Sequence, residues 1–271
     1  MTLKEKLAIC ANNGSALLAV NFYNFETLKG LLLAAKAADS PLILQLSESS
    51  LQYLGINTAV AMARAMLKEF EVQAWLHLDH GSSVEVVKKC LDAGFDSVMI
   101  DASEQPFNEN VRITKEAVKA AASYQANVEA ELGYVAKLGQ DQQAEPTSPA
   151  DAKLFAEATG IDALAIAIGN AHGFYKQTPR LRLDRLREIR AVTDCALVLH
   201  GSSGIPDDQL KEAIRSGISK INLATETKNT FMKKLQSLLA GSDEIDLRKV
   251  FPEAISEVQQ LITRKLQTIN L

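Results

Sequence analysis

The sequence predicts an α/β protein that folds as one (β/α)8 TIM barrel over residues 1–271, with an extra helix at its C-terminus. Short apolar segments alternate with longer amphipathic segments along the whole chain. Eight short segments can be distinguished, which is the number of strands that closes this type of barrel. No G-x-G-x-x-G motif follows the first of them, which argues against an open, doubly wound sheet as the alternative.

The eight short segments are almost continuously apolar and rich in Leu, Val, Ile and Ala. This pattern is typical of parallel strands whose outer face is covered by helices. We expect strands at residues 16–22, 41–47, 73–80, 97–103, 127–133, 163–170, 196–202 and 219–225.

In the intervening segments, apolar residues recur three and four positions apart, as in helices with one buried face. Ser83, Ser148 before Pro149, and Pro206 before Asp207 are typical of helix starts, and glycines 94, 160 and 217 of helix ends. We expect helices at residues 26–39, 58–70, 83–94, 107–125, 148–160, 182–193 and 206–217, an eighth after residue 225, and the extra helix at 247–267 after a polar break at 241–246.

The composition is that of an ordinary globular protein, with 47% hydrophobic and 23% charged residues. A net charge of −4 argues against a nucleic-acid partner. The three cysteines are widely spaced and form no C-x-x-C pair, as expected for reduced thiols in a cytoplasmic protein. Neither a signal peptide nor an apolar run of membrane-spanning length is recognisable, so we expect no membrane association.

Three of the four histidines lie at or just after the end of a predicted strand, and a glycine follows each of them. They are His80, His172 and His200. A single histidine of this kind is more simply explained as a hydrogen-bonded core residue. Three at equivalent strand ends would meet at one mouth of the barrel, and three imidazoles form a common zinc site that leaves one position open for substrate.

The fourth histidine, His77, lies earlier in the third strand and shares a face with Trp75 and Asp79. We interpret it as a core residue or a support for the ligands. Strict alternation would place Asp79 and His80 on opposite faces of this strand. We therefore expect the strand to end there, so that both side chains reach the mouth.

Small hydroxyl-bearing residues follow the seventh and eighth strands, where barrels of this type often bind phosphate. The first segment is G-S-S-G at 201–204 and the second is N-L-A-T at 222–225. Backbone N–H groups and hydroxyl groups in such segments can hold a phosphate group, although G-S-S-G on its own would also suit a tight turn. Acidic residues also collect at strand ends, namely Asp79, Asp101, Glu129 and Glu131, and Asp79 is the leading candidate for proton transfer.

Together, the segments LHLDHGSS, MIDAS, PFNENV, VEAELG, AIGNAHGFY, LVLHGSSGIP and KINLATETK resemble the class II, zinc-dependent ketose-bisphosphate aldolases of the fructose- and tagatose-bisphosphate type. The resemblance runs in order from about residue 19 to about residue 230. It implies a lyase of carbohydrate metabolism and glycolysis that reversibly cleaves a phosphorylated ketose into dihydroxyacetone phosphate and an aldehyde, through a zinc-stabilised enediolate. It also implies Zn²⁺ as the cofactor, with another divalent metal or an additional monovalent cation as alternatives, and a homodimer or homotetramer.

The resemblance also assigns roles to individual residues. His80, His172 and His200 would ligate the zinc ion, and Asp79 would move a proton at the C4 oxygen of the substrate. Asp101 and Glu131 would lie around the metal or at a second metal site. The residues that would hold dihydroxyacetone phosphate are Gly173, Gly201, Ser202, Ser203, Asn222, Ala224 and Thr225. Asn21 and Ser47 would line the aldehyde side.

Two segments depart from the family pattern. After Gly133 the chain lacks the double glycine and the acidic pair that are usual in the family, and Asp141 or Glu145 is the candidate replacement for the acid. Arg248 lies in a segment that resembles the family's D-P-R-K and is either a ligand for the distal phosphate, provided across a subunit boundary, or a solvated arginine at a helix start.

The sequence is compatible with three functions. The first is a zinc-dependent aldolase, the second is a zinc metallohydrolase on the same fold, and the third is a sugar-phosphate-binding barrel without catalytic activity. A Schiff-base aldolase needs an inward lysine near the mouth, whereas Lys220 lies early in the eighth strand.

Overall fold

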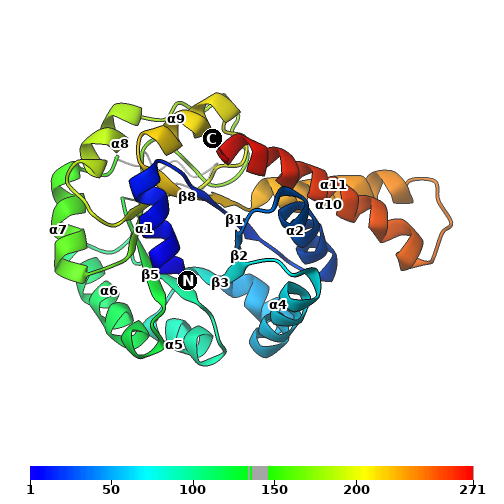
Figure 1. The fold of residues 1–271 in the computed structure, drawn as a ribbon, viewed down its shortest axis with the longest axis horizontal. Coiled ribbons are helices and arrows are strands. Elements are labelled where there is room, and N and C mark those ends of the chain that lie inside the picture. Colours follow the sequence, from blue (N-terminus) through cyan, green and yellow to red (C-terminus); the bar gives the residue numbers. More distant parts are fainter. Residues whose placement is uncertain (134, 136–145, 271) are drawn as a thin grey trace.

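A computed structural model describes residues 1–133, 135 and 146–270, and shows a closed barrel of eight parallel strands (Figure 1). Each strand pairs with its neighbours in sequence, and β1 pairs with β8 to close the barrel. The strands are β1 (Leu17–Asn21), β2 (Leu42–Ser47), β3 (Ala74–Gly81), β4 (Ser97–Ile100), β5 (Asn127–Leu132), β6 (Ala163–Ile166), β7 (Ala196–Leu199) and β8 (Ile218–Leu223). The predicted fold class is therefore confirmed.

Helices cover the outside of the barrel and pack on it through apolar faces. The α-helices of the described chain are α1 (Leu3–Asn13), α2 (Phe25–Ala38), α3 (Glu48–Leu54), α4 (Ile56–Phe70), α5 (Val84–Asp92), α6 (Phe107–Ala121), α7 (Pro149–Thr159), α8 (Leu183–Arg190), α9 (Asp207–Arg215), α10 (Thr225–Leu239) and α11 (Leu247–Ile269). The predicted start signals Ser83 and Ser148 do cap α5 and α7, because their side chains accept hydrogen bonds from the backbone N–H groups of Val86 and Asp151.

Strands β4, β6 and β7 end three or four residues earlier than the apolar runs suggest. After each of these strands the chain leaves the sheet and enters the loops that carry Asp101, His172 and His200. Ala102, Ala167 and Ile168, which follow β4 and β6, remain buried, so their apolar character reflects packing at the mouth rather than strand pairing. The early ends bring the functional loops over the axis of the barrel.

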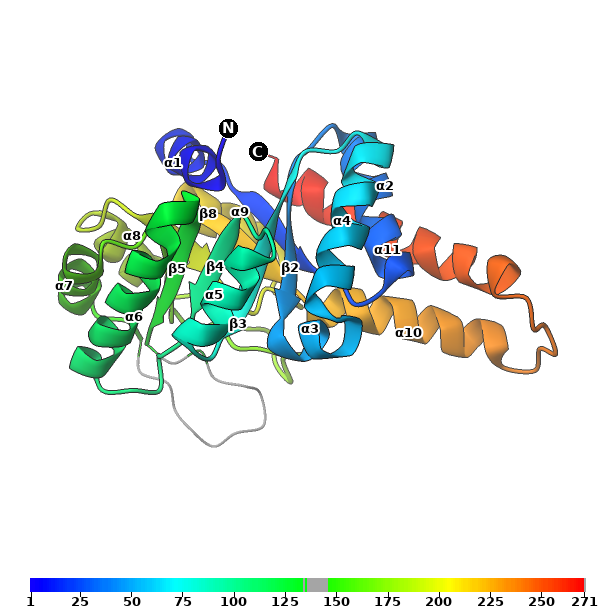
Figure 2. The same cartoon turned by 90° about the horizontal axis from the view of Figure 1, so that it is seen from below.

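The N-terminal helix α1, which the strand and helix pattern above does not include, closes the end of the barrel opposite the site (Figure 2). Its buried residues Leu3, Leu7 and Cys10 join an apolar cluster inside the barrel, which includes the first residues of several strands. The indole Nε1–H of Trp75 donates to the carbonyl oxygen of Met1 at 3.3 Å. At this end, the inside of the barrel is therefore filled with side chains and covered by α1.

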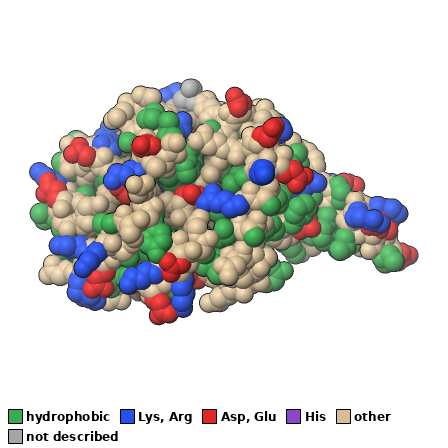
Figure 3. Space-filling model, turned by 60° about the horizontal axis from the view of Figure 1, so that its bottom comes forward, with side chains coloured by type: hydrophobic (Ala, Val, Ile, Leu, Met, Phe, Trp, Pro, Cys, Tyr) green, Lys and Arg blue, Asp and Glu red, His purple; other side chains and the backbone are tan. Residues whose placement is uncertain are grey.

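Helices α10 and α11 form an antiparallel pair that projects from the barrel, seen on the right of Figures 1 and 2. The C-terminal part of α11 returns to the barrel and packs on α2. The projecting part, from Met232 in α10 to Arg248 in α11, is called the arm here. It carries the exposed apolar residues Met232, Leu239, Ile245 and Leu247. Hydrophobic side chains are visible along the arm in Figure 3, together with acidic and basic side chains near its tip. Among the described residues, no helix combines the length and the apolar character needed to cross a bilayer.

Candidate metal centre and active site

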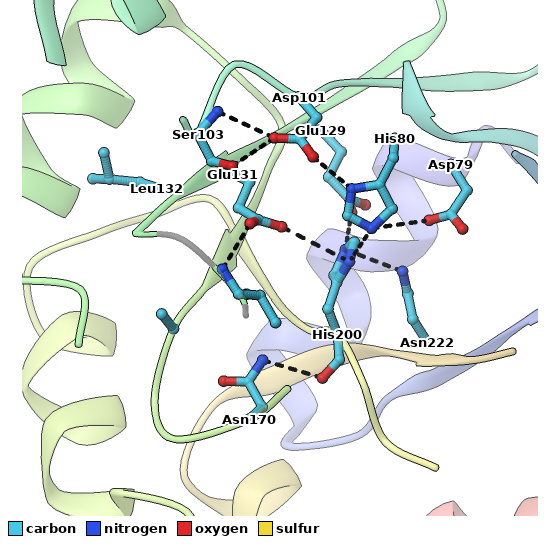
Figure 4. Close-up of polar contacts among 12 residues, drawn as sticks. Asp79, His80, Asp101, Ser103, Glu129, Glu131, Leu132, Asn170, His200 and Asn222 are labelled. Atoms are coloured by element: carbon cyan, nitrogen blue, oxygen red, sulfur yellow. Dashed lines mark hydrogen bonds and ion pairs between the residues drawn. The ribbon is translucent and has the colours of Figure 1, made fainter. Parts of the chain in front are cut away.

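The three histidines at the strand ends come together at the mouth of the barrel. Their ring centroids are 5.0 Å apart for His80 and His172, 4.7 Å for His80 and His200, and 5.6 Å for His172 and His200. Glu131 joins them from β5, and one ligand atom from each of the four residues lies within 4.8 Å of the others. Figure 4 shows His80, His200 and Glu131 pointing toward one another. Three imidazoles and one carboxylate at this spacing match the donor set of a zinc site.

A bulge in β3 directs both Asp79 and His80 to the mouth. The expectation that the strand ends at this point is wrong, because β3 continues to Gly81. Its register against β4 shifts between Leu78 and Gly81, and His80 has a left-handed backbone with φ of 52°. The bulge interrupts the strict alternation of side chains, so that Asp79 and His80 can both face the mouth. Bulges are common next to active sites, where they redirect a side chain.

Carboxylates hold the imidazoles of His80 and His200 in place. Asp101 lies 2.7 Å from Nδ1 of His80, and Glu129 lies 2.9 Å from Nε2 of His200. The opposite nitrogens, Nε2 of His80 and Nδ1 of His200, face each other at 3.0 Å. The carboxylate partners therefore leave these two nitrogens directed at the common centre, as is usual for histidines that bind a metal.

The charges at this centre are strongly coupled. Burial, together with the nearby Asp101 carboxylate, raises the pKa of Glu131 to about 8. Burial alone would lower the pKa of His80, but the carboxylates of Asp79 and Asp101 outweigh it and raise this pKa to about 9. Oε2 of Glu131 is buried and has no hydrogen-bond partner within the described part of the chain. The cluster thus retains protons and has one carboxylate oxygen without a partner. A bound cation would displace the protons and bind this oxygen.

Asp79 lies beside the metal cluster and is held by a chain of buried amides. Its Oδ2 accepts from Nδ2 of Asn21 at 2.8 Å, and Oδ1 of Asn21 accepts from Nε2 of Gln45 at 3.0 Å. The second oxygen of Asp79, Oδ1, is buried and has no hydrogen-bond partner among the described residues. One oxygen therefore fixes the orientation of the carboxylate, and the other, 3.9 Å from Nε2 of His80, can exchange a proton with a bound molecule.

A small cavity opens beside the cluster and contains most of the residues expected to bind substrate. Its lining consists of Asn21, Asp79, His172, Gly173, His200, Gly201, Ser203, Asn222, Ala224 and Thr225. Ser202 is buried behind the lining, where its hydroxyl donates to the carbonyl oxygen of Asn222 at 2.6 Å. This bond joins the loop after β7 to the end of β8, so the Ser202 side chain supports the cavity.

Gly201 allows two of the functional loops to approach each other closely. Its φ of 65° is left-handed, and a Cβ atom there would lie 2.1 Å from the carbonyl oxygen of Ala171. The hydroxyl of Tyr175 bridges the same two loops, because it accepts from the N–H of Ala171 and donates to the carbonyl oxygen of Gly201. The glycine after His200 is therefore required for the loop that carries His172 to lie against it.

Some residues expected at the site lie elsewhere. Ser47 caps α3, and its hydroxyl contacts those of Ser49 and Ser50 rather than lining the cavity. The side chain of Arg248 is 90% exposed at the end of the arm, where it pairs with Asp246. Asp141 and Glu145, the candidate acids of the loop after Gly133, lie outside the described residues.

Lys220 is fully buried inside the barrel and is not part of the cavity lining. Its amine is 2.7 Å from Oε2 of Glu129, so it is engaged in an ion pair. A Schiff base requires a neutral, accessible amine. The placement of Lys220 therefore gives no support to the Schiff-base route.

Comparisons with known proteins agree with this geometry. The family model described as "Fructose-bisphosphate aldolase class-II" matches residues 1–271. The fructose-bisphosphate aldolase of Geobacillus stearothermophilus is 40% identical over 98% of this chain and 96% of its own length. The probable fructose-bisphosphate aldolase of Bacillus subtilis matches with the same identity and coverage. The crystal structure of the YdjI aldolase from Escherichia coli is 32% identical, with a TM-score of 0.88 over 100% of this chain and 97% of that one. The chain therefore belongs to the class II fructose-bisphosphate aldolase family and is a carbon–carbon lyase.

Proposed function

We propose that this aldolase is zinc-dependent and reversibly cleaves a phosphorylated ketose into dihydroxyacetone phosphate and an aldehyde. The observation that carries the proposal is the convergence of His80, His172, His200 and Glu131 next to a cavity that also contains Asp79. The substrate class includes fructose and tagatose 1,6-bisphosphates and related ketose 1-phosphates.

The residues present fit a zinc ion. Nitrogen and carboxylate oxygen donors are those that zinc prefers, and the partnerless Oε2 of Glu131 is a buried oxygen that a cation would satisfy. We assign His80, His172 and His200 as ligands, with Glu131 as a fourth donor or as part of a second site, and Asp101 as the group that orients His80. When bound, the metal supplies Lewis-acid stabilisation of the negative charge that the ketone oxygen acquires as the carbon–carbon bond breaks.

Asp79 is assigned the proton transfer at the C4 oxygen. Cleavage removes a proton from the C4 hydroxyl as it becomes the aldehyde, and condensation returns one. The Asp79 carboxylate can accept and return this proton through Oδ1, while Asn21 holds Oδ2 in place.

Backbone N–H groups around the cavity are suited to the phosphate of dihydroxyacetone phosphate. Helix α10 begins at Thr225 in the cavity lining, and no side chain caps its N-terminus among the described residues. Helix N-termini attract anions because their first N–H groups are unpaired and the helix dipole is positive there. We therefore assign the phosphate to the loops with Gly173, Gly201 and Ser203 and to the end of β8 with Asn222, Ala224 and Thr225.

We propose that the chain forms a homodimer or homotetramer and that Arg248 acts on a second copy. The arm projects away from its own barrel and carries exposed apolar residues, including Ile245 at 91% and Leu247 at 61%. Arg248 lies beside them, so an arm that packs on another subunit would carry this guanidinium toward that subunit. A guanidinium is well suited to a distal phosphate. A cytoplasmic location is proposed from the reduced, unpaired cysteines of the described chain.

A coupled assay tests the proposed function. Zinc-loaded protein is incubated with fructose and tagatose 1,6-bisphosphates and with their 1-phosphates, and triose release is measured. We expect cleavage that a chelator abolishes and zinc restores, with no loss of activity on borohydride treatment in the presence of substrate. A borohydride-trapped lysine adduct, or hydrolysis of esters and amides without carbon–carbon cleavage, would refute the proposal. Calorimetric binding of dihydroxyacetone phosphate without any cleavage would instead favour a non-catalytic binder.

Zinc affinity is expected to increase as the pH rises from 6 to 8. The raised pKa values of His80, about 9, and Glu131, about 8, mean that both groups hold a proton near pH 7 in the metal-free protein. Zinc must displace these protons, and each one released adds about a tenfold gain in apparent affinity per pH unit. Calorimetry at pH 7 in two buffers of different ionisation enthalpy counts the protons, and a count of zero would contradict the prediction.

A further inference from the structure

Beneath the metal cluster lies a set of polar residues that the proposed reaction does not use. Lys220 on β8, Glu129 on β5 and His77 on β3 all face the inside of the barrel, and their side chains are 0% exposed. Nζ of Lys220 lies 2.7 Å from Oε2 of Glu129 and 3.3 Å from Nε2 of His77. A buried ion pair is costly to desolvate, so its presence in a barrel interior calls for a specific role.

The directions of the hydrogen bonds in this network follow from the lysine. An ammonium group only donates, so Nε2 of His77 must accept and its Nδ1 must carry the hydrogen. Nδ1 of His77 then donates to Oγ of Ser97 at 2.7 Å, and this oxygen also accepts from Nδ2 of Asn127 at 3.0 Å. The lysine is thus held from one side by a neutral histidine in a single tautomer.

On its other side the lysine acts on the metal ligand His200. Glu129 receives a hydrogen bond from Lys220 at Oε2 and, as a carboxylate, can only accept at Oε1. Nε2 of His200, 2.9 Å from this oxygen, therefore carries the hydrogen. Nδ1 of His200 is left with its lone pair directed at the centre of the cluster, toward Nε2 of His80 and Oε2 of Glu131 (Figure 4).

The amide of Asn222 must be turned over to suit this tautomer. Its Nδ2 lies 3.0 Å from Nε2 of His200, where two N–H donors would face each other, and its Oδ1 is buried without a partner in the described part of the chain. Oxygen and nitrogen of an amide are assigned from hydrogen bonding. With its oxygen turned to Nε2–H, Asn222 accepts from His200 and directs its NH2 group into the cavity.

We infer that Lys220 is a positioning residue that, through Glu129, fixes the tautomer and orientation of His200 and thereby sets the affinity of the metal site. Among the described residues, Lys220 is the only lysine or arginine within 4.0 Å of the Glu129 carboxylate. Without it, the carboxylate would be buried with no cationic partner, and it would turn toward other donors or water. The inference rests on the proposed zinc site.

The Lys220→Met variant tests this role, because methionine keeps the length and volume of the side chain and removes the charge. We expect the zinc dissociation constant, measured by competition with a chromophoric chelator, to rise about 10- to 100-fold. The visible absorption bands of the cobalt-substituted protein are expected to shift, because they report the ligand field at the metal. Lys265→Met is the matched control, since Lys265 is also buried but pairs with Asp207 and Glu226 away from the cluster. It should leave both measurements unchanged.

A double-mutant cycle with Glu129→Gln separates positioning from general loss of structure. The pair Lys220→Met and Glu129→Gln removes both charges together, so it leaves no uncompensated charge and is expected to fold even if Lys220→Met alone does not. We expect this double variant to bind zinc no more weakly than Glu129→Gln alone. Wild-type zinc affinity in Lys220→Met would overturn the inference. An equal loss of zinc affinity on introducing Lys220→Met into the wild-type protein and into the Glu129→Gln variant would also overturn it. If the unmodified protein binds no zinc, the proposed function fails as well.

Discussion

The His80→Asn variant is expected to lose tight zinc binding and to retain at most about 0.1% of wild-type kcat/KM. The loss of a metal ligand removes several kcal/mol of charge stabilisation from the transition state, which corresponds to about a 10³-fold decrease in rate. Asparagine is the appropriate substitution because His80 has a φ of 52°, and asparagine tolerates left-handed backbone better than alanine does. The measurements are zinc content after dialysis and steady-state triose release.

His77→Gln is the matched control for this experiment. His77 is also a buried histidine of β3, but it is not part of the four-donor cluster. It should retain one zinc ion per chain even if the lost contact with Lys220 weakens the binding. Circular dichroism of both variants checks that the barrel has formed. Stoichiometric zinc with wild-type affinity in His80→Asn would exclude His80 as a ligand.

The Asp79→Asn variant is expected to reduce kcat for cleavage by about 10²- to 10⁴-fold while zinc stays bound. The asparagine is nearly the same shape as aspartate, and its amide oxygen can still accept from Nδ2 of Asn21. It cannot, however, take the proton from the C4 hydroxyl. Because the defect lies in a chemical step, kcat should fall while the zinc content stays at the wild-type level.

Isotope exchange gives a sharper test of this assignment. Dihydroxyacetone phosphate alone exchanges a proton on its donor carbon with solvent, and this partial reaction involves no C4 oxygen. We expect Asp79→Asn to retain most of the deuterium exchange measured by NMR while cleavage is nearly lost. Equal loss of exchange and cleavage would show that Asp79 acts at the donor carbon or on the metal instead.

The barrel could be predicted because its strands carry a repeated local signal. Each strand buries both faces, so its apolar run is visible in the sequence, and Ser83 and Ser148 mark helix starts through hydrogen bonds that involve only neighbouring residues. Helix α1 carries a comparable signal in its sequence, although it is not among the helices expected above. Thr2 and Glu5 form a capping box, and Leu3 and Leu7 lie four residues apart.

The metal cluster could be foreseen from the histidines at strand ends, but the network beneath it could not. The pairing of Lys220 with Glu129 joins strands on opposite sides of the barrel, and no local pattern shows which charges will meet there. The signal that exists is alternation, which places Glu129 and Glu131 on the same inward face of β5. The bulge at His80 was missed for a similar reason, since it depends on how β3 pairs with β4.

The position of Trp75 at the closed end of the barrel has a practical consequence. It is the only tryptophan of the chain, and it lies under α1 on the strand that also carries Asp79 and His80. Its fluorescence emission therefore reports solvent entry at the floor of the barrel, several residues away from any bound sugar. The protein thus contains a natural optical probe for the detachment of its first helix, separate from events at the catalytic end.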